Sequence, residues 1–236
     1  MKGVIMAGGR GSRLMPLTNH LPKPLVPILD KPVMWYIVRR LRLAGVTDIA
    51  VTLGYMGDKI VEAFGDGAEM GVRLHYFREE KPLGTAGGVK NAASFLDEDF
   101  LVVSGDAYTD FDLGALADFH YEKGGLVTIA SYRVENPSRF GVIVADQNGL
   151  VRSFEEKPLH PTSRLVNTGI YVCDRRLLHF IPDGFVDFAK DVFPALLGNL
   201  YAKECAGFWS DIGTLPTYYE TNLHVVTQRQ VAADAL

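Results

Sequence analysis

Apolar residues in the first half of the chain fall into short continuous runs, and amphipathic segments separate one run from the next. The runs predict strands, because about four to eight apolar residues in succession suit a strand that is covered on both faces. The expected strands are residues 2–7, 48–53, 72–77, 100–104 and 127–132. The expected helices are residues 32–44, 59–64, 85–95 and 113–123. This alternation is typical of a mostly parallel sheet with helices on both faces.

The pattern changes from about Pro137 onwards, where the predicted elements become shorter and more varied. The expected elements are a hairpin of strands 141–145 and 151–155, a strand at 166–172, short helices at 175–180 and 188–200, an extended segment at 201–207 and a last helix at 216–228. No linker or internal repeat divides the chain. We therefore predict one α/β domain over residues 1–236. Its first part, 1–135, has a Rossmann-like, mostly parallel central sheet, and its second part, 136–228, is a smaller mixed lobe.

Composition narrows the class of protein. The chain of 236 residues is 47% hydrophobic and 22% charged, which is typical of a soluble globular protein. Its net charge of −4 argues against a general nucleic-acid surface, so any anion site must be locally basic. Cys173 and Cys205 have neither metal-type nor redox-type spacing. The N-terminus has no signal-peptide pattern, and no apolar stretch reaches the ~18 residues of a membrane span, so we expect a cytoplasmic protein that does not bind membranes.

A glycine-rich segment follows the first expected strand. Three glycines within residues 8–11 let the backbone approach a ligand closely, and successive N–H groups in such a turn form an anion site. Arg10, Arg13 and Lys23 add positive charge, so the segment indicates a polyphosphate site. An ordinary glycine-rich turn with surface arginines is the alternative.

Two common phosphate motifs are excluded for this segment. A P-loop requires Gly-Lys-Ser/Thr at the start of a helix, and that tripeptide does not occur in the chain. The dinucleotide fingerprint requires a third glycine, where this chain has Leu14. Prolines at 16, 22, 24 and 27 also argue against a helix after the glycines. We therefore expect a long irregular loop.

The complete string Gly-Gly-Arg-Gly-Ser-Arg-Leu-Met-Pro-Leu-Thr at 8–18, with Leu-Pro-Lys-Pro-Leu-Val-Pro at 21–27, resembles the signature of the sugar-1-phosphate nucleotidyltransferases, also called nucleoside-diphosphate-sugar pyrophosphorylases. The resemblance extends to about residue 223. It is nearest to the mannose-1-phosphate guanylyltransferase-like branch, on the segments Leu-Gly-Thr-Ala-Gly at 83–87, Pro-Lys-Pro at 22–24 and Trp-Ser-Asp-Ile-Gly at 209–213.

The resemblance implies a transferase of nucleotide-sugar biosynthesis, in which a sugar-phosphate oxygen attacks the α-phosphorus of a nucleoside triphosphate. The nucleophile is already an anion, so the protein must mainly position two polyanions and neutralise charge. Cations and a Mg²⁺ ion held by one or two carboxylates suit this task. Asp106, which follows the expected strand 100–104, and Asp211 resemble the two metal ligands of the family. An aspartate after a strand is also a common turn former.

The resemblance also suggests how the remaining site residues are divided. Its catalytic residues are Arg13, Lys23, Asp106 and Asp211, with the two aspartates binding the metal. Its nucleotide-binding residues are Ala7, Gly8, Gly9, Gly11, Ser12, Arg13, Glu79, Gly84, Thr85 and Gly105. Its sugar-phosphate-binding residues are Gly141, Glu156, Lys157, Asn167 and Gly169. For this last group the alternatives are an exposed hairpin edge and a hydrogen-bonded core asparagine.

Glu79 stands five residues before Gly84, at a position where thymidylyltransferase-like relatives typically carry an amide. A carboxylate can accept hydrogen bonds from both N1–H and the N2 amino group of guanine, whereas uracil and thymine offer one N–H between two carbonyls. Glu79 therefore favours GTP. An exposed pair of loop charges, Glu79 and Glu80, is the alternative.

These observations predict an enzyme that converts GTP and mannose 1-phosphate into a nucleotide sugar and pyrophosphate, with no nucleic-acid partner. A UTP- or dTTP-dependent glucose-1-phosphate enzyme, a cytidylyltransferase for another phosphate and a catalytically silent paralogue are the alternatives. The sequence leaves open the sugar, a homo-oligomeric state, and whether the chain is a short form or a fragment of a longer protein.

Overall fold

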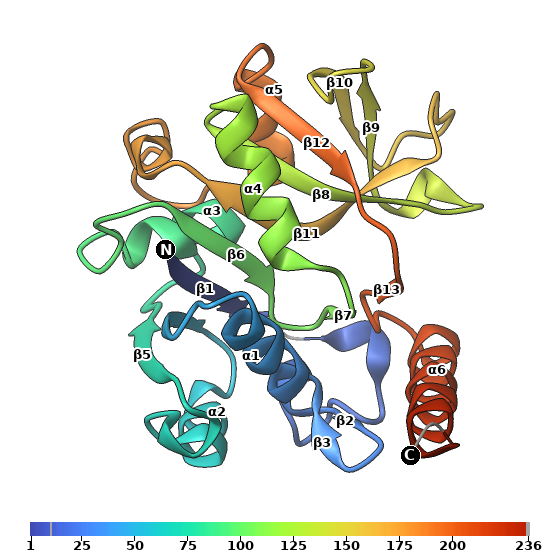
Figure 1. Cartoon of the computed structure of the whole chain (residues 1–236). Helices are drawn as coiled ribbons and strands as arrows, with labels where there is room; N and C mark the ends of the chain where they lie inside the picture. The colour runs from blue at the N-terminus through green and yellow to red at the C-terminus, as the bar shows by residue number, and fades with distance from the viewer. Residues whose placement is uncertain (10, 235–236) are drawn as a thin grey trace.

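The computed structural model describes residues 1–9 and 11–234, and its core is one nine-stranded sheet (Figure 1). Its first half is parallel, in the order β6-β1-β4-β5. The bounds of these strands are β1 Lys2–Ala7, β4 Asp48–Leu53, β5 Arg73–Arg78 and β6 Phe100–Ser104. They agree with the expected strands to within one residue at each end. The parallel half predicted from the apolar runs is therefore confirmed.

Helices cover both faces of this half. The helices are α1 Val33–Leu43, α2 Gly57–Phe64, α3 Gly84–Asn91 and α4 Leu113–Lys123. Successive residues of β1 point to opposite faces, so Ile5 packs with α1, α2 and α4, whereas Val4 packs with α3. Asp112 starts α4 by accepting a hydrogen bond from the N–H of Ala115 at 2.9 Å, and Gly124 ends it. These contacts fix the strand ends from which the site is built.

The second half of the sheet is mixed. Its strands are β8 Val127–Arg133, β9 Gly141–Ala145, β10 Val151–Glu156, β11 Leu165–Cys173 and β12 Leu200–Glu204. β11 joins the halves, because it pairs antiparallel with both β6 and β8, and β12 then adds to β8 in parallel. The predicted hairpin is confirmed as β9–β10, and it reaches the sheet through the pair Val142 and Val166.

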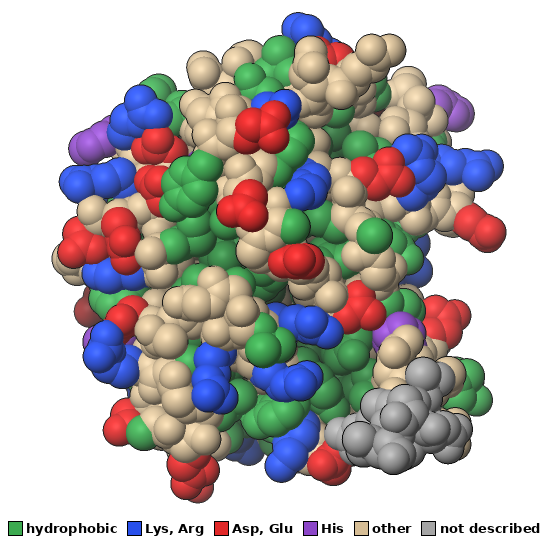
Figure 2. Space-filling view, in the orientation of Figure 1, with side chains coloured by type: hydrophobic (Ala, Val, Ile, Leu, Met, Phe, Trp, Pro, Cys, Tyr) green, Lys and Arg blue, Asp and Glu red, His purple; other side chains and the backbone are tan. Residues whose placement is uncertain are grey.

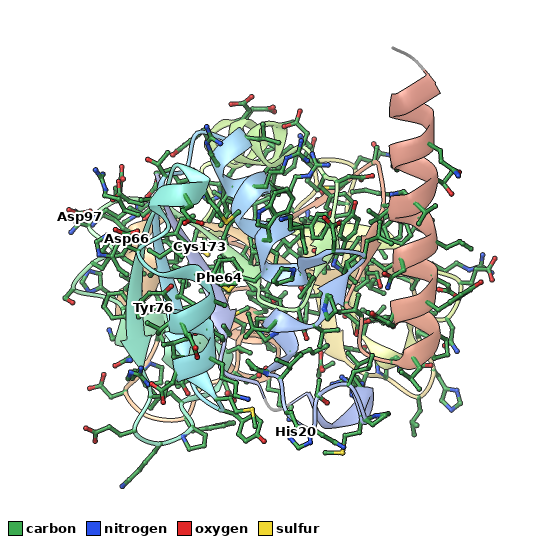
Figure 3. The ribbon with its side chains drawn as sticks, turned by 90° about the horizontal axis from the view of Figure 1, so that it is seen from below. His20, Phe64, Asp66, Tyr76, Asp97 and Cys173 are labelled. Atoms are coloured by element: carbon green, nitrogen blue, oxygen red, sulfur yellow. The ribbon has the colours of Figure 1, made fainter. Side chains whose placement is uncertain are left out.

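Several expected helices have different lengths in the structure. The helix expected at 85–95 ends at Asn91, and the segment 175–179 is a 3-10 helix. The helix expected at 188–200 is broken into a π-helix at Phe188–Val192, the short α5 at Phe193–Ala195 and a turn. Pro194 lacks the N–H that a longer helix would need. The last helix, α6 Leu215–Asp234, is longer than expected and lies at one side of the molecule (Figures 1 and 3).

The structure also contains short elements that the sequence pattern did not predict. They are the strand pairs β2 Pro27–Ile28 with β3 Lys31–Pro32 and β7 Tyr108–Thr109 with β13 Trp209–Ser210, and the 3-10 helices at Ser12–Leu14, Lys23–Leu25, Ala68–Met70 and Pro137–Arg139. Two-residue strands carry too little periodicity to be recognised.

Charged side chains of both signs are interspersed on the face shown in Figure 2. Among the described residues, none of the helices combines the length and the apolar character that a bilayer span requires.

Candidate active site

A cavity of about 500 Å³ lies at the carboxyl ends of β1, β4 and β6, where open α/β sheets bind ligands. Its lining includes most of the residues expected at the nucleotide site. These are Ala7, Gly8, Gly9, Gly11, Arg13, Glu79, Gly84, Thr85 and Gly105, and the expected catalytic residues Lys23 and Asp106 line the cavity with them. Parallel strands bring these residues together, because segments far apart in the sequence end at the same edge of the sheet.

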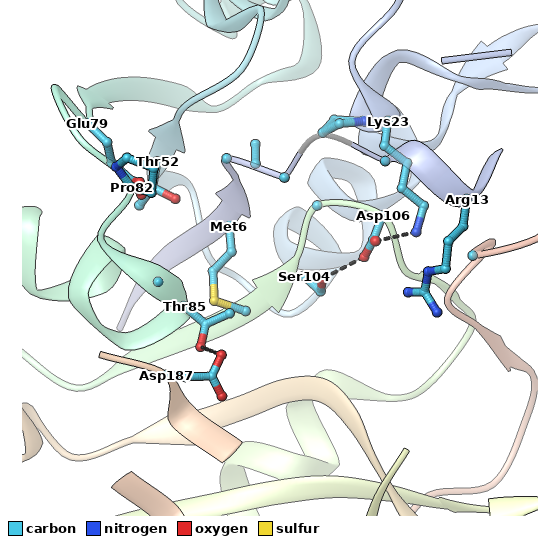
Figure 4. A pocket seen from close by; sticks show the side chains of 18 of the residues that line it. Met6, Arg13, Lys23, Thr52, Glu79, Pro82, Thr85, Ser104, Asp106 and Asp187 are labelled. Atoms are coloured by element: carbon cyan, nitrogen blue, oxygen red, sulfur yellow. Dashed lines mark hydrogen bonds and ion pairs between the residues drawn. The ribbon is translucent and has the colours of Figure 1, made fainter. Parts of the chain in front are cut away.

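Cationic and anionic groups meet at one end of the cavity (Figure 4). The ammonium of Lys23 donates to the carboxylate of Asp106 and to the backbone carbonyl of Asp211, the latter at 2.9 Å. The Lys23 side chain is only 9% exposed, so this pair is largely shielded from water. Ser104 Oγ donates to the second oxygen of Asp106 at 2.6 Å, and Arg13 lies nearby. The structure thus brings together the expected catalytic residues on this side.

Asp211 approaches the cavity from the far end of the chain. Its carboxylate accepts a hydrogen bond from the N–H of Gly213 at 3.1 Å, and Gly213 itself lines the cavity. Asp106 and Asp211 are therefore both tied to the ammonium of Lys23, one by its carboxylate and the other by its carbonyl. This arrangement places positive charge between the Asp106 carboxylate and the Asp211 backbone carbonyl.

The donor set in this place fits Mg²⁺. Among the described residues, no group of three or more His, Cys, Asp or Glu side chains could hold a metal ion. Mg²⁺ is commonly bound by only one or two carboxylates together with substrate phosphates and water. Asp106 and Asp211 supply two carboxylates. The contact of the Lys23 ammonium with the Asp106 carboxylate and the Asp211 backbone carbonyl indicates that the site tolerates a cation.

Glu79 lies at the opposite end of the cavity, with Thr52 and Pro82 (Figure 4). Its Oε2 accepts a hydrogen bond from the N–H of Leu83 at 3.1 Å. Burial raises the pKa of the Glu79 carboxyl, and the Leu83 hydrogen bond partly offsets that rise. Glu80 is exposed. The two neighbouring acids thus differ in environment, and Glu79 is not a solvated loop charge.

A third wall of the cavity comes from the segment 185–187, through Phe185 and Asp187, and the sequence pattern did not predict this segment as part of the site. The Val186 carbonyl accepts hydrogen bonds from the N–H groups of Ala86 and Gly87 at 3.0 and 3.1 Å. Gly84 permits this approach, because it has φ of +74° and a Cβ there would lie 2.5 Å from the Val186 carbonyl oxygen. Phe185 and Asp187 line the cavity beside it. No local motif in 185–187 signals this contact, which depends on tertiary packing.

The residues expected to bind the sugar phosphate lie along β9, β10 and β11, outside the lining of this cavity in the described part of the chain. Lys157 has φ of +51° and forms an ion pair with Glu156 at 2.8 Å, with 57% of its side chain exposed. Glu156 in turn borders Gly141, where a Cβ would lie 3.0 Å from the glutamate Oε2. These three residues form one group at the hairpin.

A second group of these residues lies on β11. Asn167 accepts a hydrogen bond from the N–H of Gly169 at 3.0 Å. Gly169 packs against Ser104, the residue that donates to Asp106. This strand therefore connects the edge of the cavity to the mixed half. The side chain of Ser12, also expected at the nucleotide site, and the whole of Arg10 lie outside the described residues.

Fold and site together define a nucleotidyl transferase. A family model described as nucleotidyl transferase matches residues 2–228, so the chain belongs to this family. The resemblance seen in the glycine-rich loop is thereby confirmed.

Individual relatives carry different names. The chain is 38% identical to a UTP–glucose-1-phosphate uridylyltransferase of Synechocystis sp., over 93% of its own length and 62% of the relative. It is 38% identical to a mannose-1-phosphate guanyltransferase of Debaryomyces hansenii, over 90% and 61%. The chain thus spans about three fifths of the length of these curated relatives. A solved structure from Bacillus anthracis, assigned as a glucose-1-phosphate thymidylyltransferase and crystallised with a sucrose, matches with a TM-score of 0.86, 31% identity and 94% coverage of both chains.

Proposed function

We propose that this chain transfers a nucleotidyl group from GTP to mannose 1-phosphate, giving a nucleotide sugar and pyrophosphate. Residues 1–135 supply the nucleotide site and residues 136–228 the sugar-phosphate site of one domain. The observation that carries the proposal is the distribution of charged groups between the two ends of the cavity. A partly buried carboxylate, Glu79, lies at one end, and Lys23 with Asp106 and Arg13 lies at the other.

The charged end suits the triphosphate and the departing pyrophosphate. Arg13 and Lys23 bind phosphate oxygens and stabilise the negative charge that develops between the α-phosphorus and the leaving group. Mg²⁺, when held by Asp106 and Asp211, supplies further charge neutralisation and orients the phosphates. When phosphate is bound, the Lys23 ammonium exchanges its contact with Asp106 for a phosphate oxygen.

The reaction is an in-line displacement. An oxygen of the sugar phosphate forms a bond to the α-phosphorus, and the bond between that phosphorus and the bridging oxygen to the β-phosphate breaks. No general base is required, because the attacking oxygen is already ionised. The protein contributes mainly by holding both substrates in register.

Lys157 binds the phosphate of the incoming sugar phosphate, and Asn167 with Gly169 and Gly141 surrounds the sugar. These residues lie along β9–β11, between the hairpin and the edge of the cavity, where Gly169 packs against Ser104. This position supports the assignment. The ion pair of Lys157 with Glu156 holds the lysine in place before the substrate arrives.

Glu79 reads the base. Both of its oxygens can accept hydrogen bonds, and guanine offers two adjacent donors on one edge. The names of the relatives support a second candidate, in which UTP or dTTP reacts with glucose 1-phosphate. Glu79 favours the guanine nucleotide over that alternative. The presence of Arg13, Lys23, Asp106, Lys157 and Asp211 argues against a catalytically silent paralogue.

The proposal is tested by incubating the purified chain with each of four nucleoside triphosphates and several hexose 1-phosphates, and by following pyrophosphate release. We expect the highest kcat/KM with GTP and mannose 1-phosphate. A preference for UTP or dTTP with glucose 1-phosphate would select the second candidate. Absence of pyrophosphate release from every pair would contradict nucleotidyl transfer.

A further inference from the structure

The two aspartates proposed to bind metal flank the two-stranded sheet of β7 and β13. β7 begins two residues after Asp106, and β13 ends one residue before Asp211. The strands are antiparallel, with Tyr108 opposite Ser210 and Thr109 opposite Trp209. Their pairing thus brings Asp106 and Asp211 to the same end of the pair. Any shift of β13 along β7 would change the distance between the two carboxylates.

Asp110 fastens β13 to β7 at the other end of this pair. Its N–H donates to the carbonyl of Phe208 at 3.1 Å, and its Oδ1 accepts from the N–H of Phe208 at 2.6 Å. Asp110 therefore satisfies both backbone polar groups of the residue that precedes β13. Thr109 Oγ1 donates to the same Phe208 carbonyl at 3.0 Å.

Gly207 leaves the space that the Asp110 carboxylate occupies. Gly207 has φ of +114°, and a Cβ at this position would lie only 2.2 Å from Asp110 Oδ1. Any side chain at 207 would collide with the carboxylate as well as strain the backbone. The close approach of Gly207 is needed for the Asp110–Phe208 hydrogen bond and has no other evident use.

Helix α6 contacts both Asp110 and Phe208 through His224. His224 Nε2 lies 3.4 Å from the second oxygen of Asp110. The ring of His224 stacks on Phe208, with ring centroids 4.0 Å apart and planes inclined by 8°. Asp110 is thus held between β13 and α6, away from the cavity lined by the substrate-site residues.

We infer that Asp110 is a positioning residue for the Asp106–Asp211 pair, an inference that rests on the proposed function only in treating these aspartates as metal ligands. Mg²⁺ demands a near-octahedral arrangement at short, fixed distances, so two carboxylates from distant segments must be held rigidly. Asp110 provides this rigidity without touching substrate. Loss of its carboxylate frees the N–H of Phe208 and lets β13 move relative to β7.

The first test measures metal binding. Mn²⁺ alone is titrated into the protein, and free Mn²⁺ is followed by electron paramagnetic resonance. Asp110→Ala should raise the dissociation constant of Mn²⁺. Because Asp110 acts on the ligands only through β13, we expect the increase to be at most the roughly ten- to hundred-fold that follows loss of a residue hydrogen-bonded to a metal ligand. Asp110→Asn should restore most of the affinity, because the amide oxygen can still accept from the N–H of Phe208.

The second test uses no metal and no substrate. Trp209 lies in β13 and is buried, so in a Trp35→Phe background its fluorescence reports on the strand. Asp110→Ala should shift its emission to longer wavelength and increase its quenching by acrylamide. Because no turnover is involved, this measurement decides the inference even if the transfer assay contradicts the proposed function.

Asp112→Ala is the matched control, because Asp112 lies two residues further along and loses one local hydrogen bond at the start of α4. It should leave Mn²⁺ binding and Trp209 quenching at the wild-type values. If Asp110→Ala binds Mn²⁺ as tightly as Asp112→Ala, or leaves Trp209 quenching unchanged, Asp110 does not position β13 and the inference is wrong.

Discussion

The parallel and mixed halves of the sheet contribute to the proposed site in different ways. In the parallel half, β1, β4 and β6 all end at one edge, and the residues that follow them line one cavity. In the mixed half, the residues expected to bind the sugar phosphate are distributed along β9, β10 and β11. They form two groups, one at the hairpin around Lys157 and one on β11 around Asn167.

This difference shows which site residues can be placed together from the strand topology alone. Parallel strands carry the residues at their carboxyl ends to a common place, whatever the sequence between them. In antiparallel strands, the carboxyl ends of neighbouring strands lie at opposite edges of the sheet. Residues on such strands therefore come together at one site only through specific contacts. Here those contacts are Gly169 against Ser104 and the hydrogen bond from Trp209 Nε1 to the Thr168 carbonyl at 3.0 Å.

The largest effect is expected at the junction of the halves. Asp106→Asn and Asp211→Asn should each lower kcat at least about a hundredfold, because metal-based charge stabilisation contributes several kcal/mol. Circular dichroism should remain unchanged. The exposed Asp118→Asn in α4 serves as control and should be fully active. Full activity of both site variants, or of the wild type in EDTA, would show that the reaction does not require a metal held by these aspartates.

The second prediction separates the two halves kinetically. Lys157→Ala should raise KM for the sugar phosphate about ten- to a hundred-fold, since a charge-assisted hydrogen bond contributes roughly 1.5–3 kcal/mol. Arg13→Ala should mainly lower kcat with the triphosphate. Steady-state kinetics with each substrate varied in turn measures both.

Arg152→Ala is the control for Lys157→Ala, because Arg152 lies on the same hairpin and pairs with Asp146 instead. It should leave both KM values unchanged. If Lys157→Ala leaves sugar-phosphate kinetics as in the wild type, the hairpin does not bind that substrate and the division between the halves is incorrect.

The third prediction concerns Glu79, at the end of the cavity proposed to bind the nucleobase. The kcat/KM with GTP should exceed that with UTP or dTTP by about ten- to a hundred-fold, given roughly 1.5–3 kcal/mol for each charge-assisted hydrogen bond and about 1.4 kcal/mol per factor of ten. Glu79→Gln should narrow this ratio. The exposed neighbour provides the control, and Glu80→Gln should not change the ratio. A wild-type preference for UTP or dTTP would refute the guanine assignment and leave nucleotidyl transfer standing.

The smallest effect is a pH dependence of base selectivity. Burial raises the pKa of Glu79 above its ordinary value of 4.5, so the carboxylate gains its proton at a higher pH than an exposed glutamate. A protonated carboxyl carries a donor where guanine requires an acceptor. The GTP to UTP ratio of kcat/KM, which reports on the free enzyme, should therefore fall as the pH is lowered toward that raised pKa. In Glu79→Gln the ratio should be independent of pH in this range.

The sequence predicted the parallel half well and the connections between the halves poorly. The strand 100–104 is an almost wholly apolar run, and its burial on both faces makes the pattern strong. The helix expected at 188–200 overran Pro194, which lacks the N–H of a continuing helix, and the π-helix before it has no signature in the hydrophobic periodicity. The glycine-rich loop could be recognised from its residues, whereas the cavity wall at 185–187 could not.

The reason for this contrast is physical. A glycine at a tight approach leaves a trace in the sequence, as Gly84 does, but its partner need not. Val186 contributes only a backbone carbonyl to the contact, and any residue could supply that group. In the same way β7 and β13 are too short to have a pattern of their own, although they join the two aspartates.

The most direct test of the central claim is ³¹P NMR of the chain with GTP, mannose 1-phosphate and Mg²⁺. We expect the signals of both substrates to decline together, and a nucleoside-diphosphate sugar and inorganic pyrophosphate to accumulate in equal amounts. Neither product should form when either substrate is omitted. Orthophosphate released from GTP without a nucleotide sugar, or unchanged substrates at high protein concentration, would contradict this claim.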